Sequence, residues 1–350
     1  MLTTNQLVLE RVEEMKYRRL GRTGWRVSVI GMGGIPIQRV DRQEASEIIR
    51  EALVHQINFF DSARGYTDSE EKFGRILSNE NREKYIMATK CRGFSKEEME
   101  KEINTSLQQL RVDQIDLYQL HNVRDMQLLK YIMSDDGAIV ALKEAKQAGK
   151  IKEFGITGHI IPVLLEAIQT GEFATVQFPF NAIETSAAES LMKLATDLDV
   201  GMICMKPLAG GALANGELAL KFILDYPVST VIPGMDKKEQ VQANAQVGNS
   251  LSQLTESEMN ILQNEINSIG NIFCRRCDYC RPCPQGIDIS GTFTLDSYWT
   301  RYGLKEWAVN RYRKLEINAG ACIRCGKCQT KCPYDLPIID MLARCHENMN

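Results

Sequence analysis

The sequence predicts an α/β protein in which a closed (β/α)8 barrel of the TIM type is followed by a small cysteine-rich domain. Eight short apolar runs alternate with eight amphipathic segments between residues 27 and 248, a pattern that is typical of a parallel sheet with crossover helices. Two tight groups after residue 273 hold eight of the eleven cysteines. The last quarter of the chain is therefore expected to form a separate unit.

The predicted strands are continuous apolar runs that end in polar, glycine or proline residues, as buried parallel strands do. They cover residues 27–33, 57–63, 85–90, 114–121, 151–158, 174–181, 201–207 and 228–234. The predicted helices include 42–56, 95–110, 137–149 and 237–248, and a further helix at 255–269 is expected outside the barrel. Ser95 with Glu98, and Thr255 with Glu258, are predicted to form capping boxes at two helix starts.

An open, doubly wound sheet is the alternative architecture for strictly alternating strands and helices. Its nucleotide-binding fingerprint would place G-x-G-x-x-G after the first strand. Here Gly31 and Gly33 are followed by Pro36, where the third glycine should fall. The failed fingerprint, together with eight units in roughly 220 residues, favours the closed barrel.

Composition and charge limit the classes of function. The chain is 44% hydrophobic and 25% charged, as in ordinary globular proteins. It contains no apolar run of eighteen residues, and its first twenty residues lack the apolar segment of a secretory signal, so we expect a cytoplasmic protein without a membrane span. We expect an N-terminal extension at 1–15, the barrel at 16–270 and the cysteine-rich domain at 271–350.

The two cysteine groups have spacings that are typical of iron–sulfur ligands. The second group is spaced x2, x2, x3 and followed by proline, which matches the bacterial ferredoxin run for a [4Fe–4S] cluster, and the fourth cysteine of such a run ligates the other cluster. The first group is spaced x2, x2, x2. By the same rule we expect two clusters, held by the following cysteines: Cys274, Cys277, Cys280 and Cys332 for one, and Cys322, Cys325, Cys328 and Cys283 for the other.

Zinc is the structural alternative, because C-x2-C pairs also build tetrahedral zinc sites. Four consecutive cysteines with a trailing proline, occurring twice, favour iron–sulfur clusters. Residues 271–350 carry a net charge of +4, from twelve Lys/Arg and eight Asp/Glu. These charges are scattered between the cysteines, so we expect them to offset the negative charge of the clusters, and we expect no nucleic-acid binding.

Four chemically complementary residues follow consecutive predicted strands. Asp61 ends the second strand with Tyr66 in the loop beyond it, Lys90 ends the third and His121 ends the fourth. Barrel enzymes place their chemistry at these strand ends. A phenol beside a lysine that lowers its pKa, and that an aspartate holds in place, can protonate a carbonyl oxygen. Each residue alone also has a structural explanation, as a cap, a solvated charge or a buried imidazole.

The sequence resembles the aldo-keto reductases in "YRRLGRTGWRVSVIGMGG", "NFFDSARGYTDSEEKFGRIL", "MATK" and "IDLYQLH". The cysteine runs resemble the branch of that family with a fused ferredoxin-type domain. The resemblance implies that Tyr66 is the general acid, supported by Asp61, Lys90 and His121. It also implies that NADP(H) or NAD(H) binds across the barrel mouth without a glycine fingerprint, and that the substrate is a small-molecule carbonyl compound.

The cofactor positions that this resemblance implies depart from the family pattern. The family's Ser-Asn pair, its ring-stacking aromatic residue and its Lys and Arg for the 2′-phosphate are replaced here, which leaves the choice between NADH and NADPH open. The implied cofactor-binding residues are Thr157, Gly158, Gln177, Met205, Lys206, Pro207, Leu208, Gly234, Gln240 and Asn244.

Two functions remain open from the sequence. In the first, the protein is a nicotinamide-dependent carbonyl reductase whose clusters serve structure, redox sensing or electron transfer. In the second, it is mainly an electron-transfer protein, with a ferredoxin or flavodoxin as redox partner and weak or absent hydride chemistry in the barrel. A hydride carries two electrons and a [4Fe–4S] cluster exchanges one at a time, and no flavin-binding motif is found to mediate between them.

Overall fold

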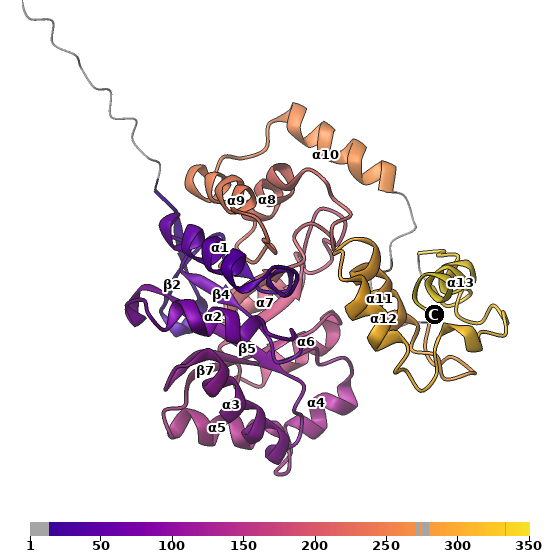
Figure 1. Cartoon of the computed structure of the whole chain (residues 1–350), viewed down its shortest axis with the longest axis horizontal. Coiled ribbons are helices and arrows are strands. Elements are labelled where there is room, and N and C mark those ends of the chain that lie inside the picture. Colours follow the sequence, from indigo (N-terminus) through magenta and orange to yellow (C-terminus); the bar gives the residue numbers. More distant parts are fainter. Residues whose placement is uncertain (1–13, 270–273, 275–279, 333) are drawn as a thin grey trace, which may run out of the picture.

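The computed structural model describes residues 14–269, 274, 280–332 and 334–350. Its centre is a sheet of eight parallel strands in sequence order (Figure 1). The sheet closes on itself, because parallel bridges join Ile30 to Val231 and Gly33 to Gly234. The predicted barrel is confirmed, and the open-sheet alternative is excluded. The strands are β3 (Met32–Gly33), β4 (Phe59–Asp61), β5 (Ile86–Cys91), β6 (Ile115–Leu120), β7 (Ile151–Thr157), β8 (Thr175–Pro179), β9 (Gly201–Met205) and β10 (Thr230–Val231).

Helices surround the strands on the outside of the barrel (Figure 1). Both predicted capping boxes are present: Ser95 exchanges hydrogen bonds with Glu98 at the start of α3, and Thr255 does so with Glu258 before α10. The helices are α1 (Arg42–Val54), α2 (Ser69–Leu77), α3 (Lys96–Leu110), α4 (Met126–Ile132), α5 (Ala138–Gln147), α6 (Ile161–Gln169), α7 (Leu191–Asp197), α8 (Gly216–Leu224), α9 (Lys238–Ser250) and α10 (Glu256–Ile269).

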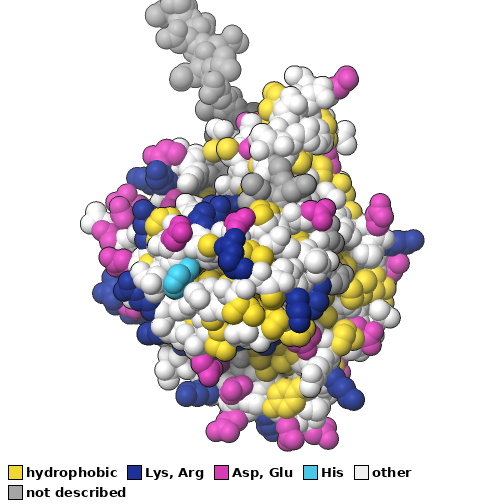
Figure 2. All heavy atoms as spheres, turned by 90° about the vertical axis from the view of Figure 1, so that its right-hand side faces the viewer, with side chains coloured by type: hydrophobic (Ala, Val, Ile, Leu, Met, Phe, Trp, Pro, Cys, Tyr) yellow, Lys and Arg dark blue, Asp and Glu magenta, His cyan; other side chains and the backbone are white. Residues whose placement is uncertain are grey.

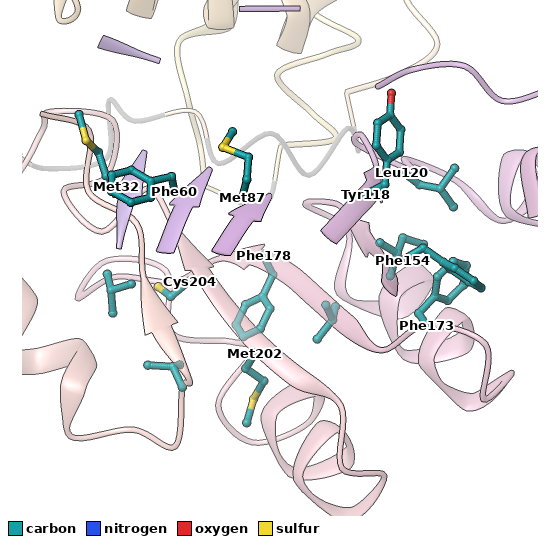
Figure 3. Close-up of a cluster of buried hydrophobic side chains, with 14 of the residues drawn as sticks. Met32, Phe60, Met87, Tyr118, Leu120, Phe154, Phe173, Phe178, Met202 and Cys204 are labelled. Atoms are coloured by element: carbon teal, nitrogen blue, oxygen red, sulfur yellow. The ribbon is translucent and has the colours of Figure 1, made fainter. Parts of the chain in front are cut away.

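The two faces of each strand bury different layers, because successive side chains point to opposite sides. Phe60, Met87 and Tyr118 point outward and belong to the large core between strands and helices; Figure 3 shows that core with Phe154, Phe173 and Met202 among its members. Their inward-pointing neighbours form a smaller apolar layer inside the barrel. That inner layer contains Phe59, Ala88, Leu117, Ile203 and Ile232.

A short antiparallel hairpin, which the sequence did not predict, closes the floor of the barrel. It consists of β1 (Tyr17–Arg19) and β2 (Arg26–Ser28). Leu20, between these strands, is fully buried with the inner layer. Gly201 leaves room for it, because a Cβ atom at that position would lie 2.8 Å from the Leu20 side chain. Chemistry is therefore confined to the opposite, open end.

The C-terminal part has a hydrophobic core of its own. It contains α11 (Ile289–Thr300), α12 (Lys305–Tyr312) and α13 (Ile338–Met349), which contribute Phe293, Tyr312 and Leu342 to that core. The segment between the two cysteine groups therefore forms helices, α11 and α12. In Figure 1 these two helices lie between the barrel and the remainder of the C-terminal part.

Two surface features bear on the classes of partner. Within the described ranges, no helix has both the length and the apolar character needed to cross a membrane. Figure 2 shows the face that carries the C-terminal part, where basic side chains are scattered among acidic and apolar ones and are not gathered into one patch.

Candidate active site

A polar layer lies directly above the apolar layer inside the barrel. Each polar side chain is two residues beyond an inward-pointing apolar one, so it also points inward. Asp61 follows Phe59, and Lys90 follows Ala88 in the same way. Asp61 and Lys90 are buried. The alternation of the strands thus brings charged groups into the open end of the barrel.

Asp61 and Lys90 form a buried ion pair. The Lys90 ammonium donates a hydrogen bond to the Asp61 carboxylate, and their side chains are only 1% and 3% exposed. It also donates to the Ser62 carbonyl oxygen at 2.8 Å. Burial raises the pKa of Asp61 and lowers the pKa of Lys90, and the mutual attraction opposes both changes. The predicted pairing of these two residues is observed.

Tyr66 lies next to this pair. The Lys90 ammonium nitrogen is 5.0 Å from the centre of the Tyr66 ring. Burial raises the pKa of Tyr66 well above its usual value of 10.0, and nearby Tyr298 and Asp61 add to the effect. The expectation that Lys90 lowers this pKa was therefore wrong in its net direction. Burial outweighs the nearby positive charge of Arg92, so the phenol keeps its proton at neutral pH.

His121 completes the group of four. Its ring centre lies 5.9 Å from that of Tyr66, with an angle of 89° between the planes. Burial, with the positive charges of Lys90 and Arg92, lowers the pKa of His121 well below its usual value of 6.5. The imidazole is therefore neutral at neutral pH. The four residues that the sequence singled out meet at one end of the barrel.

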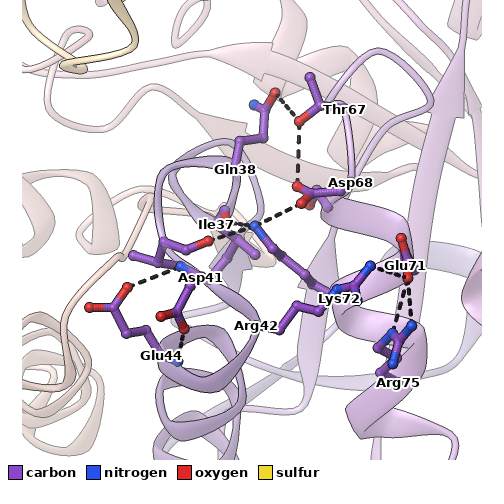
Figure 4. Close-up of polar contacts among 12 residues, drawn as sticks. Ile37, Gln38, Asp41, Arg42, Glu44, Thr67, Asp68, Glu71, Lys72 and Arg75 are labelled. Atoms are coloured by element: carbon purple, nitrogen blue, oxygen red, sulfur yellow. Dashed lines mark hydrogen bonds and ion pairs between the residues drawn. The ribbon is translucent and has the colours of Figure 1, made fainter.

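The loop that carries the phenol is held by contacts with the loop after β3 (Figure 4). The Thr67 hydroxyl donates a hydrogen bond to the Gln38 side chain at 3.0 Å. Lys72, at the start of α2, donates to the carbonyl oxygens of Ile37 and Val40 at 3.0 and 2.6 Å. These contacts fix the loop against the body of the protein, so that the phenol has a defined position.

Sequence reasoning missed Gln119 and Arg92. Gln119 donates to the Gln177 amide oxygen at 2.9 Å and lies 3.5 Å from the Asp61 carboxylate. The alternation of the strand could have indicated Gln119, because it is two residues from both Leu117 and His121, whose side chains point inward. Arg92 lies two residues beyond Lys90 and lines the cavity that opens above these residues.

A cavity of about 1190 Å³ opens above these residues. It is lined both by the barrel and by the C-terminal part of the chain, including Tyr298, Tyr302 and Trp307. Most of the implied cofactor positions also line it, whereas Thr157, Gly158 and Asn244 do not. Those that line it are Gln177, Met205, Lys206, Pro207, Leu208, Gly234 and Gln240.

Arg39 connects the two parts of the chain across the cavity mouth. Its guanidinium donates a hydrogen bond to the Tyr302 carbonyl oxygen and forms an ion pair with Asp236 at 2.8 Å. A hypothetical Cβ atom at Gly211 would lie 3.5 Å from Arg301, so the end of α11 also packs closely on the loop after β9. The C-terminal part therefore forms a roof over the barrel mouth.

Four cysteines line one small cavity in the C-terminal part: Cys283, Cys322, Cys325 and Cys328. This is the set expected for one of the two clusters, with Cys283 exchanged from the first group, and four thiols around one space suit a [4Fe–4S] cluster. Among the described residues, no three Cys, His, Asp or Glu side chains close around a single metal ion.

The second expected set is described only in part. Cys274, Cys280 and Cys332 pack against the same C-terminal core. Cys277 lies outside the described residues, and so does Pro333, the proline that follows the second group.

Comparisons with known proteins agree with both parts of the chain. A model of the aldo/keto reductase family matches residues 29–217, and a model of a 4Fe-4S dicluster domain matches residues 273–337. L-galactose dehydrogenase of Arabidopsis thaliana is 29% identical over 291 residues, covering 69% of this chain and 90% of the relative. The NADH-specific methylglyoxal reductase of Escherichia coli is 27% identical over 230 residues, covering 57% of this chain and 70% of the relative.

Solved structures include similar barrels. The holo form of the aldo-keto reductase AKR11C1 from Bacillus halodurans aligns with a TM-score of 0.63 and 26% identity, covering 73% of this chain and 96% of that one. A putative aldo-keto reductase from Pseudomonas aeruginosa aligns with a TM-score of 0.60 and 25% identity, covering 67% of this chain and 94% of that one.

Proposed function

The chain belongs to the aldo/keto reductase family and is an oxidoreductase of that type, and from this premise we propose that it reduces a small carbonyl substrate with NADH or NADPH. The observation that carries the proposal is the meeting of Tyr66, Lys90, Asp61 and His121 under one cavity. NADH or NADPH would supply, when bound, the hydride for the carbonyl carbon.

Tyr66 is the proton donor in this proposal. Its pKa lies well above 10.0, so the hydroxyl is protonated and donates its proton to the carbonyl oxygen as negative charge develops there. Neutral His121 orients the same oxygen by a hydrogen bond. Lys90 places a positive charge beside the resulting phenolate, and Asp61 keeps Lys90 charged and in place.

The open end of the barrel offers groups that suit a nicotinamide dinucleotide. Gln177 faces the cavity from β8 and its amide is oriented by Gln119, which suits a carboxamide. Lys206 and Lys237 also line the cavity, and their ammonium groups carry the positive charge that attracts phosphate groups. Gly234 and Gln240 provide no positive charge for a 2′-phosphate, so we propose that Lys237 decides between NADH and NADPH.

The C-terminal part is a 4Fe-4S dicluster domain by its family match, and we propose two [4Fe–4S] clusters held by the two exchanged sets of cysteines. Such clusters supply single-electron transfer. A ferredoxin or flavodoxin is the class of redox partner that we propose for them. Anaerobic titration with NADH or NADPH tests whether electrons pass from the nucleotide to the clusters. Bleaching of the cluster absorbance would show that they do.

The main test measures turnover of a panel of aldehydes and ketones by the anaerobically purified protein. Oxidation of NADH or NADPH is the readout. Tyr66→Phe removes the proton donor and is expected to lower kcat by at least ~100-fold. Tyr131→Phe is the matched control, because Tyr131 is an exposed tyrosine on α4 away from the cavity. No turnover on any carbonyl compound, or equal turnover by the Tyr66→Phe variant, would overturn the proposal.

A further inference from the structure

The roof of the cavity is close to the reacting hydroxyl. Tyr298 lies on α11 and Tyr302 just beyond it, and both line the cavity above Tyr66. They are near enough for their charge to affect the pKa of Tyr66. We therefore expect a substrate whose carbonyl oxygen reaches Tyr66 to contact this part of the roof as well.

Packed aromatic rings form part of the surface that α11, α12 and the turn between them present to the cavity. The ring centre of Tyr298 lies 5.4 Å from that of Tyr302 and 4.6 Å from that of Trp307. Arg311, one turn beyond Trp307, has its guanidinium carbon 3.7 Å from the centre of the indole ring. Rings held together in this way form a rigid wall that suits a planar ligand.

The arginines that line this cavity differ in their ion pairs. Arg39, Arg64 and Arg281 form ion pairs with acidic side chains at 2.8, 2.7 and 3.6 Å. Arg92 and Arg311 also line the cavity, yet neither forms an ion pair with any residue that the structure describes.

Arg92 and Arg311 line the cavity from different parts of the chain, Arg92 from the barrel and Arg311 from the roof. Arg92 follows β5 on the barrel side and is near enough to Tyr66 and His121 for its charge to affect both. Arg311 comes from α12 and is near enough to Tyr298 to interact electrostatically with it. An arginine on an aromatic wall is well suited to bind a carboxylate, since the guanidinium is planar and weakly hydrated.

We propose that α11 and α12 form the substrate-selecting wall of the active site, and that Arg92 and Arg311 bind the carboxylate of a planar carbonyl substrate. The helices between the two cysteine groups would thus determine specificity for the reaction in the barrel. This inference rests on the proposed carbonyl reductase function and assigns the chemical class of its substrate.

Matched pairs of substrates test this inference. In each pair an acid is compared with its methyl ester: 4-carboxybenzaldehyde with methyl 4-formylbenzoate, and phenylglyoxylate with methyl phenylglyoxylate. The first pair places the carboxylate across the ring from the carbonyl group, and the second places it next to the carbonyl group. At least one acid is expected to have a kcat/KM at least tenfold above that of its ester.

Variants then locate the source of the preference. Arg311→Gln and Arg92→Gln are each expected to lower the acid-to-ester ratio of kcat/KM at least fivefold, and Arg311→Lys is expected to retain part of it. Lys305→Gln is the matched control, because Lys305 also lies on α12 over an aromatic ring, that of Trp299 at 4.9 Å, but does not line the cavity. The control is expected to keep the ratio of the unsubstituted protein.

Failure of this inference and failure of the proposed function give different results. Turnover without any preference for the acids, or a preference that survives both arginine substitutions, would overturn the inference and leave the carbonyl reductase function standing. Absence of all turnover would overturn the function. The affinities of the protein for benzoate and for benzamide, measured by tryptophan fluorescence, would then test the inference. Tighter binding of benzoate would support it, and equal affinity for the two would contradict it.

Discussion

The ring of Tyr66 meets the ring of His121 edge to face, with 5.9 Å between the centres and 89° between the planes. Both rings adjoin the same cavity, so a carbonyl oxygen that accepts a proton from Tyr66 is within reach of the His121 imidazole. The pKa values of the two groups are shifted in opposite directions. The pKa of Tyr66 is raised and that of His121 is lowered, each mainly by burial.

These shifts predict the pH dependence of the reaction. Tyr66 stays protonated and His121 stays neutral between about pH 6.5 and 10, so kcat/KM is expected to show no titration of either group in that range. The measurement is a pH profile of kcat/KM for the unsubstituted protein and for His121→Gln. A decline in activity near pH 6.5 that the His121→Gln substitution removes would contradict the prediction.

The same shift of His121 affects stability. Because its pKa in the folded protein lies below the usual 6.5, the unfolded chain takes up a proton first as the pH falls. The free energy of unfolding is therefore expected to decrease as the pH falls below about 6.5. Urea unfolding at pH 5.5 and 7.5 checks this, and His121→Gln is expected to reduce the difference between the two values. A difference of the same size in the variant would contradict it.

Breaking the Lys90–Asp61 pair is predicted to be more damaging than removing it. Both side chains are almost fully buried, so Lys90→Met leaves an unpaired carboxylate inside the barrel and is expected to cost about 3–5 kcal/mol. The double substitution Asp61→Leu with Lys90→Met is expected to cost less than Lys90→Met alone, and so less than the sum of the single ones. Denaturant unfolding of the four proteins gives this comparison, and strictly additive effects would rule out a coupled pair.

Arg39 is predicted to hold the roof in place. Arg39→Gln removes both the ion pair with Asp236 and the hydrogen bond to the Tyr302 carbonyl oxygen. Loss of hydrogen bonds to a charged group costs about 1.5–3 kcal/mol, so KM for the carbonyl substrate is expected to rise roughly tenfold. Amide hydrogen exchange in α11 is expected to become faster.

A matched substitution separates this effect from a general loss of charge. Arg42→Gln breaks an ion pair with Glu71 at 3.2 Å, in which the Arg42 side chain is 65% exposed. It is expected to leave both KM and the exchange of α11 unchanged. An Arg39→Gln variant whose α11 exchanges at the original rate would show that the roof is held by other contacts.

The sequence predicted the barrel because the chain repeats one simple pattern eight times. Its strands are buried on both faces, so hydrophobicity alone located all eight strands, and the strand ends then located Asp61, Lys90 and His121. The hairpin around Leu20 was missed because β2, at Arg26–Ser28, runs into the apolar run 27–33, and the whole run was assigned to the first barrel strand, which is only Met32–Gly33.

Two further features depended on three-dimensional contacts that no local pattern contains. The pKa of Tyr66 depends on burial under Tyr298 and Tyr302, which are more than 230 residues away in the chain. The roof likewise depends on the packing of α11 against the barrel through Arg39. The cysteine spacing gave an exchanged ligand set, and one half of that set is found around one cavity.

The exchange of Cys283 between the two cysteine groups yields the last prediction. Cys283 and Cys325 line the same cavity, so both are expected to serve one cluster, whereas Cys332 serves the other. Anaerobically purified protein should contain about eight iron atoms, and each single Cys→Ser variant should retain about four. The double variant Cys283→Ser/Cys325→Ser should also retain about four, because both substitutions damage the same cluster, whereas Cys283→Ser/Cys332→Ser should lose nearly all iron. Cys204→Ala, in the core of the barrel, is the control with full iron content. The reverse result for the two double variants would place Cys283 in the cluster of its own sequence group.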